Sequence, residues 1–170
     1  LTLRLLPLPQ YKETFLVQST SLQKATEMVA ALLSEGITPC TLEYMDQTAI
    51  SVVKSMLTEP FDDSVKALLL IELDGEPELV KIQSERLKKL FEKKEEFTIQ
   101  QAQGEKEVKE LWKARRSITP ATFNLKPNKI SEDVAVPRSA IPELVKFTEQ
   151  LSKELNLTIL TFGHAGDGNI

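Results

Sequence analysis

The sequence predicts a mixed domain in which strands and helices alternate along the chain. Three observations lead to this: apolar residues repeat at helical spacing in several segments, short apolar runs lie between them, and 170 residues suffice for one domain with a core. Alternation of this kind fits a doubly covered parallel α/β sheet. It fits equally an α+β sandwich of split βαβ units with its helices on one face. Periodicity does not decide between the two.

The first third of the chain contains the clearest helix. Residues 1–9 read as an edge strand that Pro7 and Pro9 end, because proline cannot donate to a sheet. Thr20 then stands three residues before Gln23, which is the spacing of a capping box. Apolar residues follow at helical period, and Gly36 ends the helix.

The remaining elements follow from the same two kinds of pattern. The run at 67–73 is continuously apolar, which predicts a strand buried on both faces near the centre of the sheet. Asp46, Pro77 and Ser139 stand where helices begin. The other expected strands are 11–19, 39–45, 97–102, 134–136 and 157–162; the other expected helices start after 46, at 77, at 105 (to 118) and after 139, the last with a buried row of Leu144, Phe147, Leu151 and Leu155.

Composition excludes several classes of protein. The 21 basic and 25 acidic side chains are interleaved and sum to −4, so no basic field is present to attract nucleic acid. No apolar run approaches the roughly 20 residues that span a bilayer. The single Cys40 excludes an internal disulfide framework and a cysteine-rich zinc site. A lone thiol is compatible with a reducing cytoplasm, where we expect the protein.

The last residues carry the densest group of chemically useful side chains. Residues 163–169 (GHAGDGN) hold the only histidine, His164, and three of the six glycines. One interpretation is a glycine-rich turn at a strand end. The other is a site in which imidazole, carboxylate and amide groups face a metal, a polar substrate or a proton in transit. The run lacks the following helix of a dinucleotide fingerprint and the lysine of a phosphate-binding loop.

One charged residue lies on the apolar face of a predicted helix. Val108 and Trp112 set that face, and Arg115 follows at the i+7 position from Val108. An inward guanidinium needs an anionic partner, because burial without one is costly. The partner could be Glu132 or Asp133, or a bound carboxylate ligand held bidentately. Alternatively, Arg115 reaches solvent from the helix end, where it favours the helix dipole.

These features together resemble the C-terminal domain of the FAD-linked oxidases, which are flavoproteins of the vanillyl-alcohol-oxidase type. The resemblance rests on residues 163–169 preceded by 132–139 (EDVAVPRS), with support from 111–116, 70–75 and 5–9. It is strongest toward glycolate oxidase and D-lactate dehydrogenase subunits. It implies an α+β cap with a ferredoxin-like antiparallel sheet and helices packed on one face.

The resemblance also implies an activity and a set of site residues. The family oxidises a 2-hydroxy acid to a 2-oxo acid by hydride transfer to FAD. By position, Arg115 and Thr119 match substrate contacts, and Asn169 matches a residue that faces substrate or flavin. His164 matches a ligand of a divalent metal such as Zn²⁺ or Mn²⁺. No residue of this chain matches a catalytic acid or base.

The resemblance further predicts how the chain is organised. Residues 1–9 would be the tail of, or linker from, a missing N-terminal FAD-binding domain, and residues 10–170 the cap domain, truncated at its C-terminal end. The expected partners are that domain, a small 2-hydroxy acid and other oxidase subunits, without nucleic acid. The fragment alone is expected to be inactive. The alternative is a stand-alone ferredoxin-like binding or interaction module without catalysis.

Overall fold

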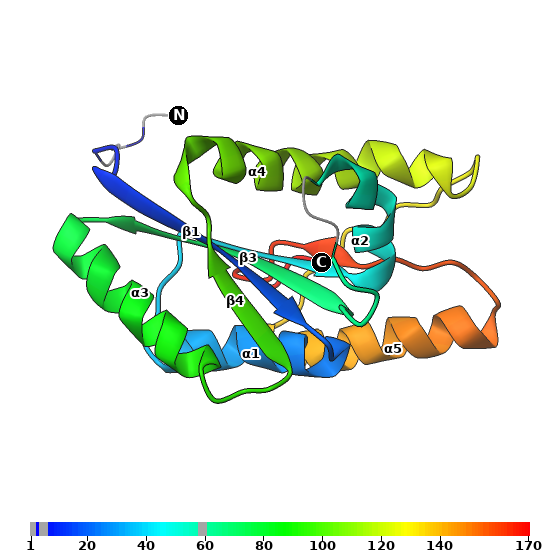
Figure 1. Cartoon of the computed structure of the whole chain (residues 1–170). Coiled ribbons are helices and arrows are strands. Elements are labelled where there is room, and N and C mark those ends of the chain that lie inside the picture. The colour runs from blue at the N-terminus through cyan, green and yellow to red at the C-terminus, as the bar shows by residue number, and fades with distance from the viewer. Residues whose placement is uncertain (1–2, 4–6, 58–60) are drawn as a thin grey trace.

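The computed structural model describes residues 3, 7–57 and 61–170, and its centre is one antiparallel sheet (Figure 1). The strand order is β4-β1-β3-β2-β5, and all four neighbouring pairs are antiparallel. The α+β class is therefore confirmed, and a parallel sheet is excluded. The strands are β1 Tyr11–Ser19, β2 Thr41–Asp46, β3 Ala67–Gly75, β4 Phe97–Gln101 and β5 Phe162–Gly163.

Helices cover both faces of this sheet. The α-helices are α1 Leu22–Ser34, α2 Gln47–Val53, α3 Pro77–Phe91, α4 Gly104–Ala121 and α5 Ile141–Glu154; short 3₁₀ turns occupy Lys54–Met56, Thr122–Asn124 and Arg138–Ala140. Figure 1 shows α1, α3 and α5 below the sheet and α2 and α4 above it. The expectation that helices pack on one face is therefore wrong.

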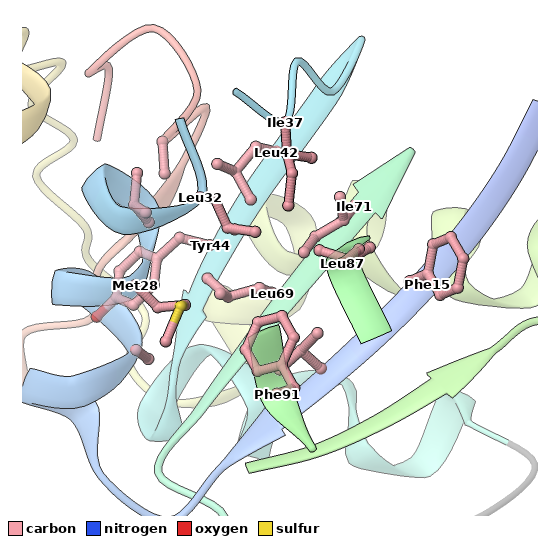
Figure 2. Close-up of a cluster of buried hydrophobic side chains, with 14 of the residues drawn as sticks. Phe15, Met28, Leu32, Ile37, Leu42, Tyr44, Leu69, Ile71, Leu87 and Phe91 are labelled. Atoms are coloured by element: carbon pink, nitrogen blue, oxygen red, sulfur yellow. The ribbon is translucent and has the colours of Figure 1, made fainter. Parts of the chain in front are cut away.

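The central strand explains why two helical layers are needed. Leu69 and Ile71 belong to the core between the sheet and helices α1 and α3. Leu68 and Leu70 belong to a second core between the sheet and helices α2 and α4. Figure 2 shows the first core, where side chains of α1 and α3 meet those of the strands. The prediction that β3 is buried on both faces is confirmed, and each of its apolar faces requires its own cover.

Helix starts follow the predicted chemistry in two cases and depart from it in two. Asp46 caps α2, and Pro77 occupies the first turn of α3, as expected. The cap of α1 is Ser21 rather than Thr20, because the Ser21 hydroxyl accepts from the amide of Lys24. Ser139 caps no helix, since it lies within the 3₁₀ turn that leads into α5.

The buried row of α5 also differs from the prediction. Its buried residues are Ile141 and Val145, while Phe147 and Leu155 are both more than half exposed. A helical repeat of apolar residues marks an amphipathic stripe, but the contact with α1 selects which part of the stripe is covered.

Two predicted strands are shorter than expected. Residues 134–136 form only an isolated bridge, Ala135 to Asn169, and residues 157–162 contribute only the start of β5. Of the predicted edge strand at 1–9, residues 1, 2 and 4–6 lie outside the described residues, and residues 3 and 7–9 are not strand. Within the described part of the chain, no helix has the length and apolar character needed to cross a bilayer.

Candidate functional site

Glu43 is a buried carboxylate in the middle of β2. Its neighbours Leu42 and Tyr44 point into the core between the sheet and α1. Because side chains alternate along a strand, Glu43 points to the opposite face, toward α4. Only 3% of the residue is exposed. A buried carboxylate needs donors, and two side chains from distant segments supply them.

Arg115 is the first of these donors. Its Nε lies 2.9 Å and its Nη2 2.7 Å from Oε2 of Glu43, and the Arg115 side chain is 11% exposed. The guanidinium carbon also lies 4.8 Å from the ring centre of Phe162. The prediction that Arg115 points inward is confirmed. Its partner, however, is neither Glu132 nor Asp133, which are both exposed.

His164 is the second donor. β5 pairs with β2 in a register that places Gly163 opposite Tyr44. His164, the residue after Gly163, therefore lies beside Glu43. Nδ1 of His164 lies 2.5 Å from Oε1 of Glu43, while the His164 side chain is 60% exposed. A carboxylate paired with a guanidinium accepts hydrogen bonds, so in the neutral imidazole Nδ1 donates to Glu43 and the lone pair lies on Nε2.

The glycine-rich segment is a tight turn that holds His164 in place. The His164 carbonyl accepts from the amides of residues 167, 168 and 169, and the Gly166 amide donates to the Leu42 carbonyl. Gly168 has φ +89°, and a Cβ there would lie 2.1 Å from the Val136 carbonyl oxygen. The turn interpretation is therefore confirmed, because the glycines allow a turn that holds His164 beside Glu43; the site interpretation stays a prediction.

A network beside this site anchors β5 to β2. Both oxygens of Asp46 are used: Oδ1 accepts from the Ala49 amide at 2.7 Å, and Oδ2 accepts from the Thr161 amide and hydroxyl at 2.5 and 2.9 Å. The Tyr44 hydroxyl lies 3.1 Å from that of Thr161. Burial raises the pKa of both Asp46 and Tyr44. The network sets the register that brings His164 to Glu43.

A second buried carboxylate, Glu72 of β3, lies on the same face of the sheet. Oε1 accepts from the Trp112 indole at 2.9 Å and the Thr14 hydroxyl at 3.1 Å, and Oε2 accepts from Lys12 at 3.0 Å and Thr41 at 3.4 Å. Burial alone would raise the pKa of Glu72, but the bonds from Trp112 and Lys12 outweigh it and leave the pKa lowered. Glu72 thus binds α4 to the sheet one turn before Arg115.

The side chains of the other predicted site residues, Thr119 and Asn169, do not join the bonds around Glu43 and His164 among the described residues. Thr119 is exposed one turn beyond Arg115, and its carbonyl accepts a hydrogen bond from the Thr122 hydroxyl at 2.7 Å. The backbone amide of Asn169 donates a hydrogen bond to the backbone carbonyl of His164. Among the described residues, neither side chain has a hydrogen bond to Glu43 or His164.

The described residues do not show the predicted metal site. The described residues contain no group of three or more histidine, cysteine, aspartate or glutamate side chains that could hold a metal ion. One feature does fit a metal ligand: the His164 side chain is 60% exposed while its Nδ1 lies against Glu43, and ligating histidines characteristically donate their other N–H to a carboxylate. His164 is therefore the one residue of the predicted metal site for which the described structure offers a matching feature.

Sequence reasoning missed Glu43, the residue that joins the site. The available signal was an acidic residue in the centre of the short strand predicted at 39–45. Alternation placed it opposite Leu42 and Tyr44, but the sequence did not show that α4 would cover that face.

The chain is similar in sequence to known proteins. Residues 8–170 match the family model described as FAD linked oxidases, C-terminal domain. The chain is 38% identical over 167 residues to the glycolate oxidase subunit GlcD of Bacillus subtilis, covering 98% of this chain and 36% of that protein. It is 26% identical to a probable mitochondrial D-lactate dehydrogenase of Danio rerio, covering 99% of this chain and 34% of that protein.

A solved structure shares the fold at lower sequence identity. The 4-ethylphenol oxidase from Gulosibacter chungangensis superposes with a TM-score of 0.66 at 13% identity, over 92% of this chain and 37% of that one. The chain thus spans about a third of the length of the relatives that it matches.

Proposed function

This chain belongs to the family of FAD-linked oxidase C-terminal domains, and from that premise we propose that it is the substrate-binding cap of an FAD-dependent 2-hydroxy-acid oxidoreductase. The reaction is the oxidation of a 2-hydroxy acid, of the glycolate or D-lactate type, to a 2-oxo acid. The observation that carries the proposal is the meeting of Arg115 and His164 at one buried carboxylate. A cationic donor and an imidazole side by side suit an α-hydroxy carboxylate.

Arg115 is the group that binds the substrate carboxylate. Glu43 occupies the edge of the guanidinium formed by Nε and Nη2. The opposite edge, formed by Nη1 and the second proton of Nη2, is the one that a substrate carboxylate would occupy bidentately. The aromatic ring of Phe162 lies against the guanidinium and limits its movement. Thr119, exposed on the next turn, is a second contact to the substrate.

The remaining groups are assigned by the same premise. FAD is bound mainly by an N-terminal domain and, when bound, supplies the acceptor for the substrate hydride. His164 contributes one ligand to a divalent metal such as Zn²⁺ or Mn²⁺, and Asn169 faces substrate or flavin. Residues 1–9 form the connection to the N-terminal domain and 10–170 the cap. We place the protein in the cytoplasm, with other oxidase subunits as partners.

The test is the substitution Arg115→Lys in the full-length protein that carries this chain. Lysine keeps the charge but cannot form a bidentate pair, so we expect KM for glycolate or D-lactate to rise about tenfold or more, as the loss of one charged hydrogen bond predicts. The control is Arg116→Lys, because Arg116 is exposed and rests on the Trp112 ring instead. An unchanged KM in a folded Arg115→Lys enzyme would remove Arg115 from the substrate site.

A further inference from the structure

We propose that Glu43 is a positioning residue that orients Arg115 and His164 together, so that the substrate anchor and the metal ligand are aligned by one carboxylate. This inference rests on the proposed function, since it assumes that both partners act on a ligand. Glu43 itself faces no ligand: only 4% of its side chain is exposed.

The two oxygens of Glu43 divide the work between the partners. Oε2 accepts both bonds from Arg115, and Oε1 accepts the single bond from His164. Glu43 lies in a strand that is paired on one side with β3 and on the other with β5. The carboxylate is therefore held by the sheet itself, and it can act as a fixed reference for two side chains that come from a helix and a turn.

For Arg115, the contact selects one orientation of a long side chain. A guanidinium bound along its Nε and Nη2 edge directs its other edge away from the sheet. Without the Glu43 charge, the same guanidinium would be nearly buried beside a neutral group and would move toward water. Substrate binding would then have to order it again.

For His164, the contact selects one tautomer. In the neutral imidazole, donation from Nδ1 to Glu43 leaves the lone pair on Nε2, and 60% of the His164 side chain is exposed. A carboxylate behind a histidine fixes the ring orientation and makes the opposite nitrogen a better metal ligand. Thus one acidic residue prepares the ligand nitrogen as well as the anion-binding edge.

Glu72 shows what a purely structural carboxylate looks like on this face. It is as buried as Glu43, at 3% exposure, and it already fastens α4 through Trp112. None of its four donors is Arg115 or His164. Glu43 differs only in its partners, which makes Glu72→Gln the matched control for Glu43→Gln.

The experiment compares Glu43→Gln, Glu43→Asp and Glu72→Gln in the full-length holoenzyme. We expect Glu43→Gln to raise KM for the 2-hydroxy acid about tenfold or more, with a smaller change in kcat. We expect it to weaken binding of added Mn²⁺ or Zn²⁺ about 10- to 100-fold. Glu43→Asp keeps the charge but is one methylene shorter, so it should recover part of both losses. Glu72→Gln should lower the melting temperature while KM and metal affinity stay within about twofold of the parent.

The tautomer of His164 separates this inference from the function on which it rests. Imidazole ¹⁵N chemical shifts, assigned by comparison with His164→Gln, should show the proton on Nδ1 in the parent and a mixture in Glu43→Gln. A parent protein with the proton on Nε2, or a KM in Glu43→Gln equal to that of Glu72→Gln, would overturn the positioning role. A parent that oxidises neither glycolate nor D-lactate would overturn the proposed function, whatever the tautomer.

Discussion

Replacement of Asp46 by asparagine tests how the site is held together. Asp46 is 7% exposed and accepts at both ends of its carboxylate, from the Ala49 amide and from the two donors of Thr161. Asparagine has one acceptor oxygen, so it can serve α2 or β5 but not both. The donors at the other end, those of Ala49 or of Thr161, then face the NH₂ group of the asparagine, which is itself a donor.

The size of the effect follows from these contacts. If the asparagine oxygen serves β5, the lost helix cap costs about 1 kcal/mol; if it serves α2, the loss falls on Thr161 instead. Leaving buried donors of Thr161 without an acceptor costs about 1–3 kcal/mol. Part of this loss is offset, because burial raises the pKa of Asp46 and a neutral side chain avoids that desolvation. We expect a net loss of about 2 kcal/mol of unfolding free energy, which for a chain of this size lowers Tm by about 4–8 °C.

Urea unfolding measured by the fluorescence of the single tryptophan, Trp112, provides the assay. The control is Asp62→Asn, because Asp62 is exposed and its one strong bond, from the Ser64 amide at 2.8 Å, can also be accepted by asparagine. That control should lie within about 0.5 kcal/mol of the parent. If Asp46→Asn also stays within that margin at an unchanged m value, the carboxylate does not hold β5, and the reasoning is refuted.

Three further results are expected. Gly168→Ala should destabilise the chain far more than Gly36→Ala. Both glycines have positive φ, but only at Gly168 would the new Cβ lie 2.1 Å from the Val136 carbonyl oxygen. Equal urea midpoints for the two variants would contradict this expectation. The pKa of Glu72 is lowered from 4.5 in the folded chain, so the folded state binds fewer protons than the unfolded one and stability is lost as the pH falls through that range. The unfolding free energy of Glu72→Gln should therefore depend less steeply on acid pH than that of the parent. Parallel plots of unfolding free energy against pH would disprove this. Partial desolvation raises the pKa of Cys40 to about 11 from 9.0, so alkylation at pH 8 should be about a hundredfold slower in the folded chain than in urea, and equal rates would refute the shift.

Much of the fold could be predicted from local signals. The start of α3 at Pro77 and the cap of α2 at Asp46 depend on chemistry within one turn of the chain, and both are confirmed. The doubly buried β3 followed from its unbroken apolar run. The inward face of Arg115 followed from helical geometry alone.

Other features could not be predicted because they depend on contacts between distant segments. The buried row of α5 is chosen by its contact with α1, so the apolar stripe alone indicated Phe147, which is exposed. The capping box at Thr20 competed with Ser21, whose hydroxyl is the one that accepts from the Lys24 amide in the fold. The prediction of helices on one face failed because it did not use the two apolar faces of β3.

The sequence by itself singled out two candidate site residues: an arginine on an apolar helix face, and the only histidine within a glycine-rich turn. These are local properties, since helical rotation and glycine's freedom at positive φ act over a few residues. Only the tertiary structure decided that both side chains meet at Glu43, because antiparallel pairing of β5 with β2 and the packing of α4 bring together segments far apart in the chain. A buried carboxylate is costly without hydrogen-bond donors. Which donors reach it is set by the fold rather than by spacing along the sequence.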